Sequence, residues 1–411
     1  MKIGCAGTAD GKQKAPVPLA LALIEWLSGN ECHDLDEAEV IAHLGRKLVA
    51  AGLPIARLTL HLRTLHPEII GRTLAWAPGE RVEMHDREYG IEQSALFAGS
   101  PLQRAMQGRE WSTTRLDGYT ASEWMHLDVF RNRNLTEVIV APLPNADGSV
   151  SAATFGTTRS TGFTASDQRV LERIAPALRT ACELLVLRQS EANLLDVYVG
   201  PQTGSRILAG HIRRGDVESI EASLLFCDLR GFTELSNRLP AARVLQLLNL
   251  YYDQVVPAVA SKGGEIVKFM GDGVLAIFHL DEGPEASCAA ALQAAVSALE
   301  RLAHLPQPGA DLRAGIALHH GAISYGNIGS GQRLDFTVIG PAVNLTSRLQ
   351  ALCGYGGRPP LLMSAGFADL LGRVDVVPVG RYALKGFEGL IEAFRLCSDE
   401  KTTNHARGLR S

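Results

Sequence analysis

The sequence predicts an α+β fold in more than one domain. The chain has 411 residues, and its 46% hydrophobic and 20% charged residues are typical of a globular protein with a sizeable core. This length is enough for two or three domains. Apolar segments with the period of strands occur next to segments with the period of amphipathic helices in both halves. The mixture favours sheets covered by helices, with some strands paired through short turns.

The amino-terminal half begins with helix patterns and continues with strand patterns. The predicted elements are helices at 18–28 and 35–51 and strands at 55–63, 73–76, 137–143 and 151–157. A turn-rich segment, 144–148, joins the last two strands, and Thr164 to Asp167 opens a long helix. This order resembles sensory domains of the GAF and PAS type. We therefore expect residues 1–165 to form a domain that receives a small-molecule or protein signal.

Six aromatic residues lie in the middle of this half, at about 80–135. They are Tyr89, Phe97, Trp111, Tyr119, Trp124 and Phe130. Aromatic side chains can enclose a planar ligand, and they also fill ordinary cores, so both roles stay open. His61 and His66 would point to opposite faces of a continuing strand, and we do not expect them to share a metal ion.

A helix and a connector, residues 166–217, are expected to join the two halves. Apolar residues spaced by three and four mark the helix, at Leu171, Ile174, Leu178, Ala181 and Leu185. The spacing suits a parallel helical pair, yet two heptads can equally be one amphipathic face packed on its own domain. Pro176 is expected to kink the helix, and the glycine-containing segment 194–218 is predicted to be a connector.

The first motif that suits phosphate chemistry is LFCDLRGFT. It places Asp228 after an apolar strand, 222–226, and continues through Gly231 into a predicted helix that begins near Thr233, the expected N-cap. The backbone N–H groups of Gly231, Phe232 and Thr233 would then point outward and could bind a phosphate.

The second motif is a predicted hairpin, 265–278, whose turn contains Asp272 between two glycines. If this hairpin pairs with the strand that ends at Asp228, the two carboxylates meet at one edge and can bind divalent cations. Two metal ions there would activate an attacking oxygen and stabilise a leaving phosphate. Either aspartate alone could equally cap a helix or form a turn.

Helix and strand patterns continue to residue 396. They predict helices at 241–261, 285–304 and 342–352, strands at 312–323 and 333–339 around a Gly-rich turn at 326–331, and closing strands. Asn344 and Arg348 are four apart on the last helix and share a face. An amide that orients a sugar and a guanidinium that stabilises phosphate charge can act together from that face.

Together these motifs resemble the catalytic domain of class III nucleotidyl cyclases, over residues 218–397. The resemblance implies a β-α-β-β-α-β sandwich of palm-like, ferredoxin-like topology. It also implies a role for each position. Asp228 and Asp272, with the carbonyl of Leu229, match the ligands of two Mg²⁺ or Mn²⁺ ions. Lys268 and Thr337 match purine-binding positions, Asn344 the ribose-binding position, Arg348 the transition-state arginine, and Lys385 a lysine that reaches the terminal phosphates.

The resemblance further implies a reaction and an assembly. Thr337 in place of an aspartate resembles the adenine-directed subclass IIIb, so the expected reaction is ATP to 3′,5′-cyclic AMP and pyrophosphate. In this family one site takes its metal ligands from one subunit and its base- and ribose-binding residues from the other, which implies a homodimer. The alternatives are a guanylate cyclase and a ligand-binding regulatory protein with an inactive cyclase domain.

Composition limits the expected partners and location. The net charge of −4, with no long basic run, argues against nucleic-acid binding. The seven cysteines are scattered and form no C-x-x-C pair, which suits reduced thiols in the cytoplasm. No apolar stretch reaches the roughly 18 residues of a membrane span. The polar segment 398–411 is expected to be disordered.

Overall fold

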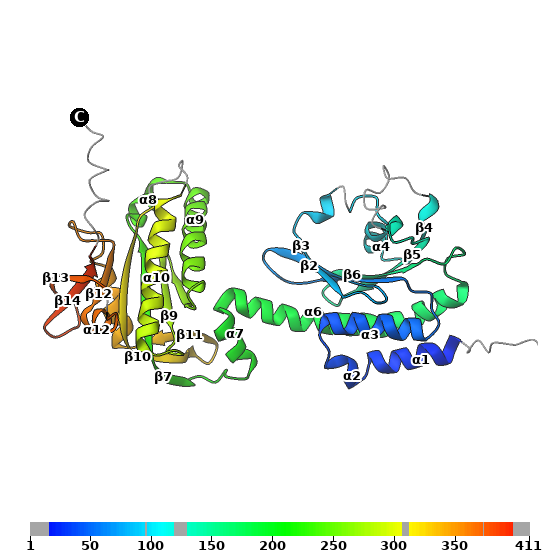
Figure 1. Cartoon of the computed structure of the whole chain (residues 1–411), viewed down its shortest axis with the longest axis horizontal. Helices are drawn as coiled ribbons and strands as arrows, with labels where there is room; N and C mark the ends of the chain where they lie inside the picture. The colour runs from blue at the N-terminus through cyan, green and yellow to red at the C-terminus, as the bar shows by residue number, and fades with distance from the viewer. Residues whose placement is uncertain (1–15, 95–96, 119–129, 306–311, 373, 398–411) are drawn as a thin grey trace, which may run out of the picture. The chain divides into compact units, whose positions relative to one another are not determined.

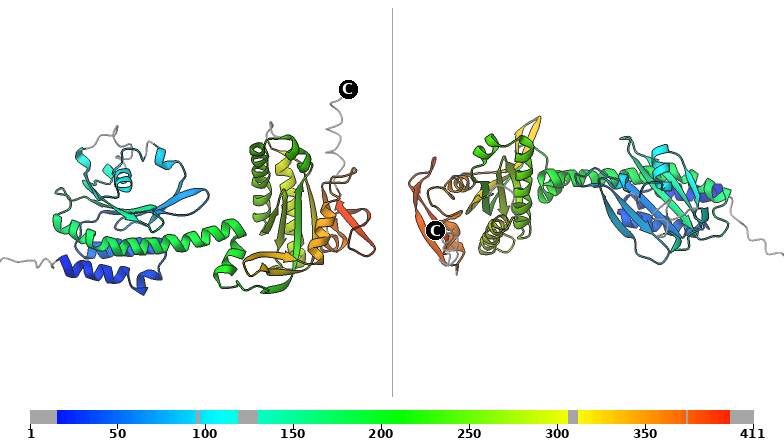
Figure 2. Two further views of the ribbon diagram at one scale, coloured as in Figure 1. Left: turned by 180° about the vertical axis from the view of Figure 1, so that it is seen from behind. Right: turned by 90° about the horizontal axis from the view of Figure 1, so that it is seen from above.

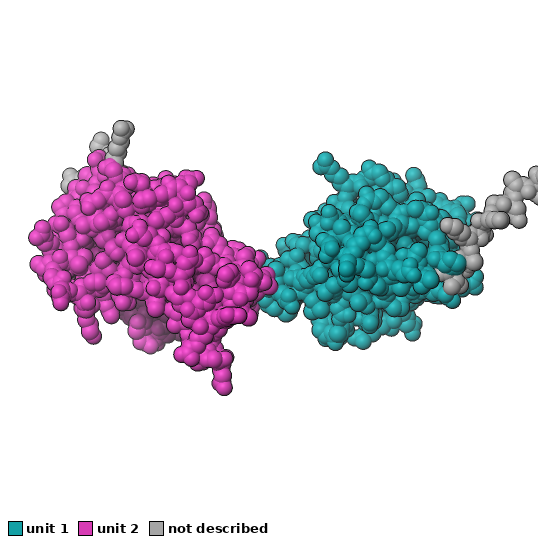
Figure 3. Space-filling model, turned by 90° about the horizontal axis from the view of Figure 1, so that it is seen from below, with its two compact units in different colours: residues 1–194 teal, residues 195–411 magenta. Residues whose placement is uncertain are grey.

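The computed structural model describes residues 16–94, 97–118, 130–305, 312–372 and 374–397. Two compact units, residues 1–194 and 195–411, make up the chain (Figure 3). Tyr119, Trp124 and the predicted tail 398–411 lie outside the described residues. In the described segments, no helix combines the length and the apolar character needed to cross a bilayer.

The first unit is built on one antiparallel sheet. Its strands are β1 Arg57–Arg63, β2 Ile69–Trp76, β3 Glu83–Glu88, β4 Ser112–Arg115, β5 Glu137–Pro144 and β6 Val150–Thr157. Its helices are α1 Pro16–Leu27, α2 Asn30–His33, α3 Glu37–Ala50, α4 Pro101–Gly108 and α6 Ala165–Val199, with short 3-10 helices η1 Ile91–Gln93 and η2 Leu116–Gly118. The strand order is β3-β2-β1-β6-β5-β4. Helices α3 and α6 pack on one face of the sheet, with α1 in an outer layer beyond them, and α4 packs on the other face (Figure 1).

Strand β1 shows how one segment serves both faces of this sheet. Leu58, Leu60 and Leu62 are buried in the core that the three helices form. Each buried leucine stabilises the fold by about 1.5–3 kcal/mol. The residues between them, Thr59 and His61, therefore point to the face that α4 covers. The resemblance of this unit to GAF and PAS domains stays a prediction.

Helix α6 packs on its own unit. Its apolar residues, Val170, Leu171, Ile174, Leu178, Ala181, Cys182 and Leu185, are buried in the core of the first unit. The spacing by three and four thus serves packing on this unit, and it does not leave the seam free for a second helix. The helix continues through Pro176, whose carbonyl accepts a hydrogen bond of 3.1 Å from the Thr180 hydroxyl.

The segment 194–218, predicted as a connector, is partly helical. Helix α6 extends to Val199, and α7 follows at Pro201–Leu208. Gly200 has a φ of 86°, which separates the two helices, and Pro201 occupies the first turn of α7, where its missing N–H is not needed. Gly200 therefore marks a helix end, whereas Gly204 lies inside α7.

The second unit is a sheet of eight strands with helices on both faces. The strands are β7 Val217–Leu229, β8 Glu265–Met270, β9 Gly273–Phe278, β10 Ala314–Ser330, β11 Arg333–Ile339, β12 Leu361–Ser364, β13 Val376–Ala383 and β14 Leu390–Leu396. The helices besides α7 are α8 Phe232–Arg238, α9 Ala241–Ala260, α10 Pro284–Ala303, α11 Pro341–Gln350 and α12 Ala365–Leu370. The order is β13-β14-β12-β10-β7-β9-β8, and β11 pairs with β10. The predicted α+β class is confirmed.

Helices α9 and α10 cover one face of this sheet, and α11 packs on the other (Figure 2). Along β7, Leu225, Cys227 and Leu229 point into the core beneath α9 and α10. Because side chains alternate along a strand, Asp228 faces the α11 side. Near its end, β7 thus presents the Asp228 carboxylate on the face of the sheet where α11 packs.

The far half of β10 and strand β11 fold over towards β8. The Tyr325 hydroxyl donates to Oε1 of Glu265 at 2.8 Å, and the Thr203 hydroxyl of α7 donates to the same oxygen at 3.0 Å. Nε2 of His279 lies 3.0 Å from the other oxygen. Burial alone would raise the pKa of Glu265, but the hydrogen bonds from His279, Tyr325 and Thr203 outweigh it and lower the pKa. A partnered buried carboxylate therefore joins α7, β8 and β10.

The Gly-rich turn predicted at 326–331 is wrong in position, because most of this segment is the end of β10. A Cβ at Gly326 would lie 2.2 Å from the carbonyl oxygen of Asp216, and one at Gly329 would lie 2.3 Å from that of Arg333. These glycines therefore allow neighbouring backbone to approach closely. The turn itself is confined to residues 331–332.

Candidate active site

Two aspartates meet at one edge of the second sheet. Asp228 is the last but one residue of β7, and Asp272 lies in the turn between β8 and β9, the hairpin that pairs with β7. Gly271 opens this turn with a φ of 66°. Burial, and then a hydrogen bond and charge repulsion with Asp272, raise the pKa of Asp228 to about 7. The hairpin thus places the two carboxylates close together, and a Cβ at Gly273, the residue after Asp272, would lie 3.6 Å from Oδ1 of Asp228.

The donor atoms at this edge suit a hard divalent cation. Two partly buried carboxylates in contact repel each other unless a proton or a cation lies between them. Leu229 packs its side chain into the core, so only its carbonyl can face the edge. In the described ranges, no group of three or more His, Cys, Asp or Glu side chains could hold a metal ion. Further ligands would be water and substrate phosphates, as is usual for Mg²⁺.

Arg230 lies beside the aspartates and was not predicted as a site residue. Its Nη2 donates to the carbonyl of Gln350 at 2.6 Å, and its Cζ lies 4.8 Å from the ring centroid of Tyr355. A Cβ at Gly315 would come within 1.9 Å of Nη2, so glycine leaves the space that the guanidinium fills. The positive charge opposes the rise in the pKa of Asp228. In the sequence, only its position two residues after Asp228 indicated that Arg230 would lie near the aspartates.

Helix α8 begins at Phe232, and its N-cap is Gly231 with a φ of 74°. The prediction of Thr233 as N-cap is wrong, because the left-handed glycine turns the chain into the helix earlier. The N–H groups of Phe232 and Thr233 belong to the first turn, where a helix offers no acceptor of its own. Their binding to a phosphate stays a prediction.

Lys268 lies beside strand β11. Its ammonium forms an ion pair with Oδ2 of Asp335, and both side chains are partly exposed. Thr337 is two residues further along β11, on the same face as Asp335, because Phe336 between them points into the core. The fold thus brings the predicted pair Lys268 and Thr337 to one place. Asp335 was missed, since its partner is 67 residues away in sequence.

Asn344 and Arg348 lie on the exposed side of α11. Residues between them, such as Thr346, are buried against the sheet. Lys385 is exposed in the loop between β13 and β14. Within the described part of the chain, the side chains of Asn344, Arg348 and Lys385 have no hydrogen-bond or ion-pair partner. All three are therefore available to a ligand.

Exposed apolar side chains surround Lys268, Asp335 and Thr337. Phe269 and Met270 follow Lys268 on β8 and are 50% and 40% exposed. Leu334 and Ile339 flank the Asp335 and Thr337 positions on β11 and are 38% and 50% exposed. Apolar residues gathered in this way are typical of an interaction surface. We call these four residues the apolar rim.

Part of this chain is similar to known proteins. Residues 217–397 match the family described as the adenylate and guanylate cyclase catalytic domain. An uncharacterized protein of Mycobacterium tuberculosis is 40% identical over 133 residues, which are 32% of this chain and 24% of that protein. An adenylate cyclase of Anabaena cylindrica is 33% identical over 155 residues, with 34% of this chain and 29% of that protein covered. The matched part is thus less than a third of these relatives.

Two solved structures are also similar. The adenylyl cyclase CyaB from P. aeruginosa has 27% identity and a TM-score of 0.40, with 45% of this chain and 97% of that chain covered. A guanylyl cyclase has 28% identity and a TM-score of 0.40, with 46% and 96% covered.

Proposed function

Because residues 217–397 form a catalytic domain of the class III adenylate and guanylate cyclase family, we propose that this protein converts ATP into 3′,5′-cyclic AMP and pyrophosphate. The observation that carries the proposal is the pairing of β7 with the β8-β9 hairpin, which places Asp228 and Asp272 at one sheet edge, within a fold that also brings Lys268 to the strand of Thr337. The carboxylates suit the phosphates and their cations, and the second group suits a purine. An inactive domain is less well supported, because Asn344 and Arg348 are also present and accessible.

In the proposed reaction, the ribose 3′-oxygen attacks the α-phosphorus, the bond to pyrophosphate breaks, and the hydroxyl proton passes to solvent. Asp228, Asp272 and the Leu229 carbonyl would hold two Mg²⁺ or Mn²⁺ ions, which would activate the hydroxyl and neutralise the triphosphate. Asn344 orients the ribose. Arg348 stabilises the charge that develops on the phosphate, and Lys385 binds the terminal phosphates.

The base is selected by hydrogen-bond polarity. Lys268 donates to a ring nitrogen of adenine, and the Thr337 hydroxyl accepts from the exocyclic amine. One observation favours the second candidate, a guanylate cyclase. The Asp335 carboxylate beside Lys268 is an acceptor that suits the ring N–H and the amine of guanine.

We propose that the active unit is a homodimer, as the family resemblance implies. The apolar rim next to Lys268 and Asp335 supports this, because a second copy would cover it and would bring its own Asp228 and Asp272. Each dimer would then contain two sites, and a monomer would be inactive.

The first unit is proposed to regulate the cyclase as a sensory domain. Its own sheet and core support an independent role, since the two units are compact separately. We further propose a cytoplasmic location. The six cysteines that the structure describes are all free thiols, which suits a reducing compartment.

The test is turnover of ATP and of GTP by the purified chain with Mg²⁺ or Mn²⁺, with product identification by mass spectrometry. We expect cyclic AMP, and at least about tenfold lower kcat/KM for GTP, which corresponds to about 1.4 kcal/mol of discrimination. Faster turnover of GTP would establish the second candidate. If neither nucleotide is cyclised while the protein is folded, the catalytic proposal fails.

Asp335→Asn sharpens the choice of base. If the carboxylate only partners Lys268, ATP turnover changes less than about threefold, as expected for a partly exposed ion pair. A selective loss of GTP turnover would instead show that Asp335 binds guanine.

A further inference from the structure

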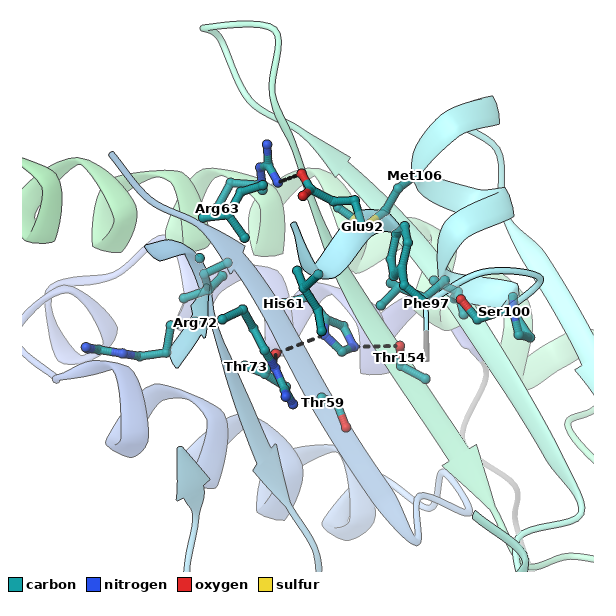
Figure 4. A pocket seen from close by; sticks show the side chains of 18 of the residues that line it. Thr59, His61, Arg63, Arg72, Thr73, Glu92, Phe97, Ser100, Met106 and Thr154 are labelled. Carbon is teal, nitrogen blue, oxygen red and sulfur yellow. Dashed lines mark hydrogen bonds and ion pairs between the residues drawn. The ribbon is translucent and has the colours of Figure 1, made fainter. Parts of the chain in front are cut away.

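The first unit contains a cavity of about 250 Å³ between its sheet and α4. Strands β1, β2, β5 and β6 supply one side of the cavity, and η1, α4 and the residues near them supply the other (Figure 4). Pockets for small organic ligands start at about 300 Å³. This cavity is slightly smaller, so it suits only a small molecule.

One side of the cavity is apolar. It contains Phe97, Leu102, Met106 and Phe130. Two of the six aromatic residues noted in the sequence thus line a cavity, whereas Tyr89 is 55% exposed on the surface. An apolar wall of this kind packs well against a flat ring.

The opposite side, formed by the sheet, is polar although it is buried. Thr59, Thr73 and Thr154 are only 6–7% exposed, and all three line the cavity. His61 stands between two of them, with Nδ1 3.4 Å from the Thr73 hydroxyl and Nε2 3.3 Å from the Thr154 hydroxyl (Figure 4). Buried polar groups are stable where they are partnered, and here the partners lie within the row itself, so the cavity has a polar wall that can form hydrogen bonds to a ligand.

The hydrogen bonds of this row determine which group donates and which accepts at each residue. Arg87 donates from Nε to the Thr73 hydroxyl at 3.1 Å, so the Thr73 proton is directed to Nδ1 of His61. Burial, and then the charges of Arg87 and Arg57, lower the pKa of His61 to about 3, so the ring is neutral. Its Nε2–H then donates to Thr154, and the Thr154 proton is left to donate to a ligand.

The cavity also carries unbalanced positive charge. Four arginines line it, and three of them are paired: Arg57 with Glu83 at 3.5 Å, Arg63 with Glu92 at 3.0 Å, and Arg72 with Asp86 at 2.6 Å. Among the described residues, Arg87 has no carboxylate partner. Its two terminal nitrogens are therefore available, and a guanidinium fork matches a carboxylate.

We propose that this cavity binds a small aromatic carboxylate. Arg87 and the Thr154 hydroxyl hold the carboxylate, and Phe97, Met106 and Phe130 pack against the ring. The inference names a chemical class for the signal that the proposed sensory role requires. That this ligand regulates the cyclase rests on the proposed function, whereas binding itself needs no cyclase activity.

The test is isothermal titration calorimetry on the full chain with benzoate, phenylacetate and indole-3-acetate, each compared with its neutral amide. At least one carboxylate is expected to bind with a Kd below about 1 mM, and its amide about tenfold more weakly. Arg87→Gln should weaken that carboxylate by about 10- to 100-fold, because it removes a charged hydrogen-bond donor. Arg81→Gln, which removes the same charge outside the cavity lining, should leave the affinity unchanged.

Thermal unfolding of each ligand-free variant shows whether it is folded. Thr154→Val keeps the side-chain shape and should weaken the carboxylate by about 3- to 10-fold, so the proposal can be tested even if Arg87→Gln fails to fold. The proposal is overturned if no carboxylate in the panel binds, if acid and amide bind equally, or if the Arg87 and Arg81 variants behave alike. None of these outcomes bears on cyclase activity, which is measured separately.

Discussion

The two units use the second face of their sheets in opposite ways. In the first unit, α4 encloses the polar residues Thr73 and Thr154, so a complete cavity forms within one chain. In the second unit, Lys268 and Arg348 remain accessible beside the apolar rim. Similar polar groups on a sheet can therefore line a pocket within one chain or, in the proposed homodimer, half of a shared site. The difference lies in whether the same chain covers them.

The largest expected effect tests whether the second site is shared. Asp272→Ala and Arg348→Ala should each lower turnover by at least about 10²–10³-fold, because the first removes a proposed metal ligand and the second a proposed interaction with the reacting phosphate. Random pairing of the two variants gives about half heterodimers with one intact site of two, so a mixture should recover up to about a quarter of the wild-type activity.

Turnover of cyclic nucleotide by the mixture is the measurement, and differently tagged chains report heterodimer formation. Heterodimers without activity would mean that each chain builds its own site, and the contrast between the units would disappear.

A smaller effect is expected from the buried carboxylate that joins α7 to the sheet. Glu265→Ala leaves Tyr325, Thr203 and His279 without their shared acceptor, and should lower the free energy of unfolding of the second unit by about 3 kcal/mol. The exposed Glu234→Ala, which removes an ion pair with Arg238 on α8, should change it by less than about 0.5 kcal/mol. Calorimetry measures both, and equal effects would contradict the role given to Glu265.

The first unit should lose stability in mild acid because of His61. The pKa of this residue in the folded state is about 3, below its ordinary value of 6.5. As the pH falls below about 6.5, the unfolded chain binds a proton that the folded chain does not, so stability falls with the pH. Relative to His61→Gln, the wild type should lose about 2 kcal/mol between pH 7 and pH 5.

Tryptophan fluorescence during urea unfolding is a suitable measurement, since Trp26, Trp76, Trp111 and Trp124 all lie in the first unit. If the free energy of unfolding changed with pH equally in the wild type and in His61→Gln, His61 would be accessible to protons in the folded state, and the cavity would then be open to water.

The smallest expected effect concerns the start of α8. Thr233→Ala should change stability by less than about 0.5 kcal/mol and turnover by less than about twofold, because only the Thr233 backbone is proposed to act. Gly231→Ala should cost about 1 kcal/mol, since its φ of 74° disfavours any side chain although the space is open. A larger loss of stability or of turnover in Thr233→Ala would show that the Thr233 hydroxyl caps the helix or binds a ligand.

Much of the second unit could be predicted, because local patterns specify its strands and turns. The hairpin around Asp272 follows from the glycines on both sides, and its pairing with β7 brings Asp228 into contact. The pair of Lys268 and Asp335 could not be predicted from spacing. It depends on how β10 and β11 fold over β8, which the contact between Tyr325 and Glu265 fixes.

The first unit was harder to predict because its patterns suit more than one structure. The residues Leu171 to Leu185 have the spacing of a helical pair, and only the tertiary fold shows that they pack on their own sheet. The same difficulty arises at the start of the second unit, where the segment after Val199 contains glycines, yet α7 forms because Thr203 and Arg206 pack against Tyr325. His61 offered no local hint of a cavity, since an alternating strand is also typical of a surface sheet.

If a nucleotide base binds at Lys268 as proposed, its entry would exchange partners in the ion pair between Lys268 and Asp335. A purine that accepts a hydrogen bond from Lys268 would release the carboxylate, which must then find water or another donor. Binding would therefore be favoured only for a base that forms hydrogen bonds with both groups. Any other base would lose the free energy of the Lys268–Asp335 ion pair without replacing it. Discrimination between nucleotides would in this way begin before any metal ion or phosphate is engaged.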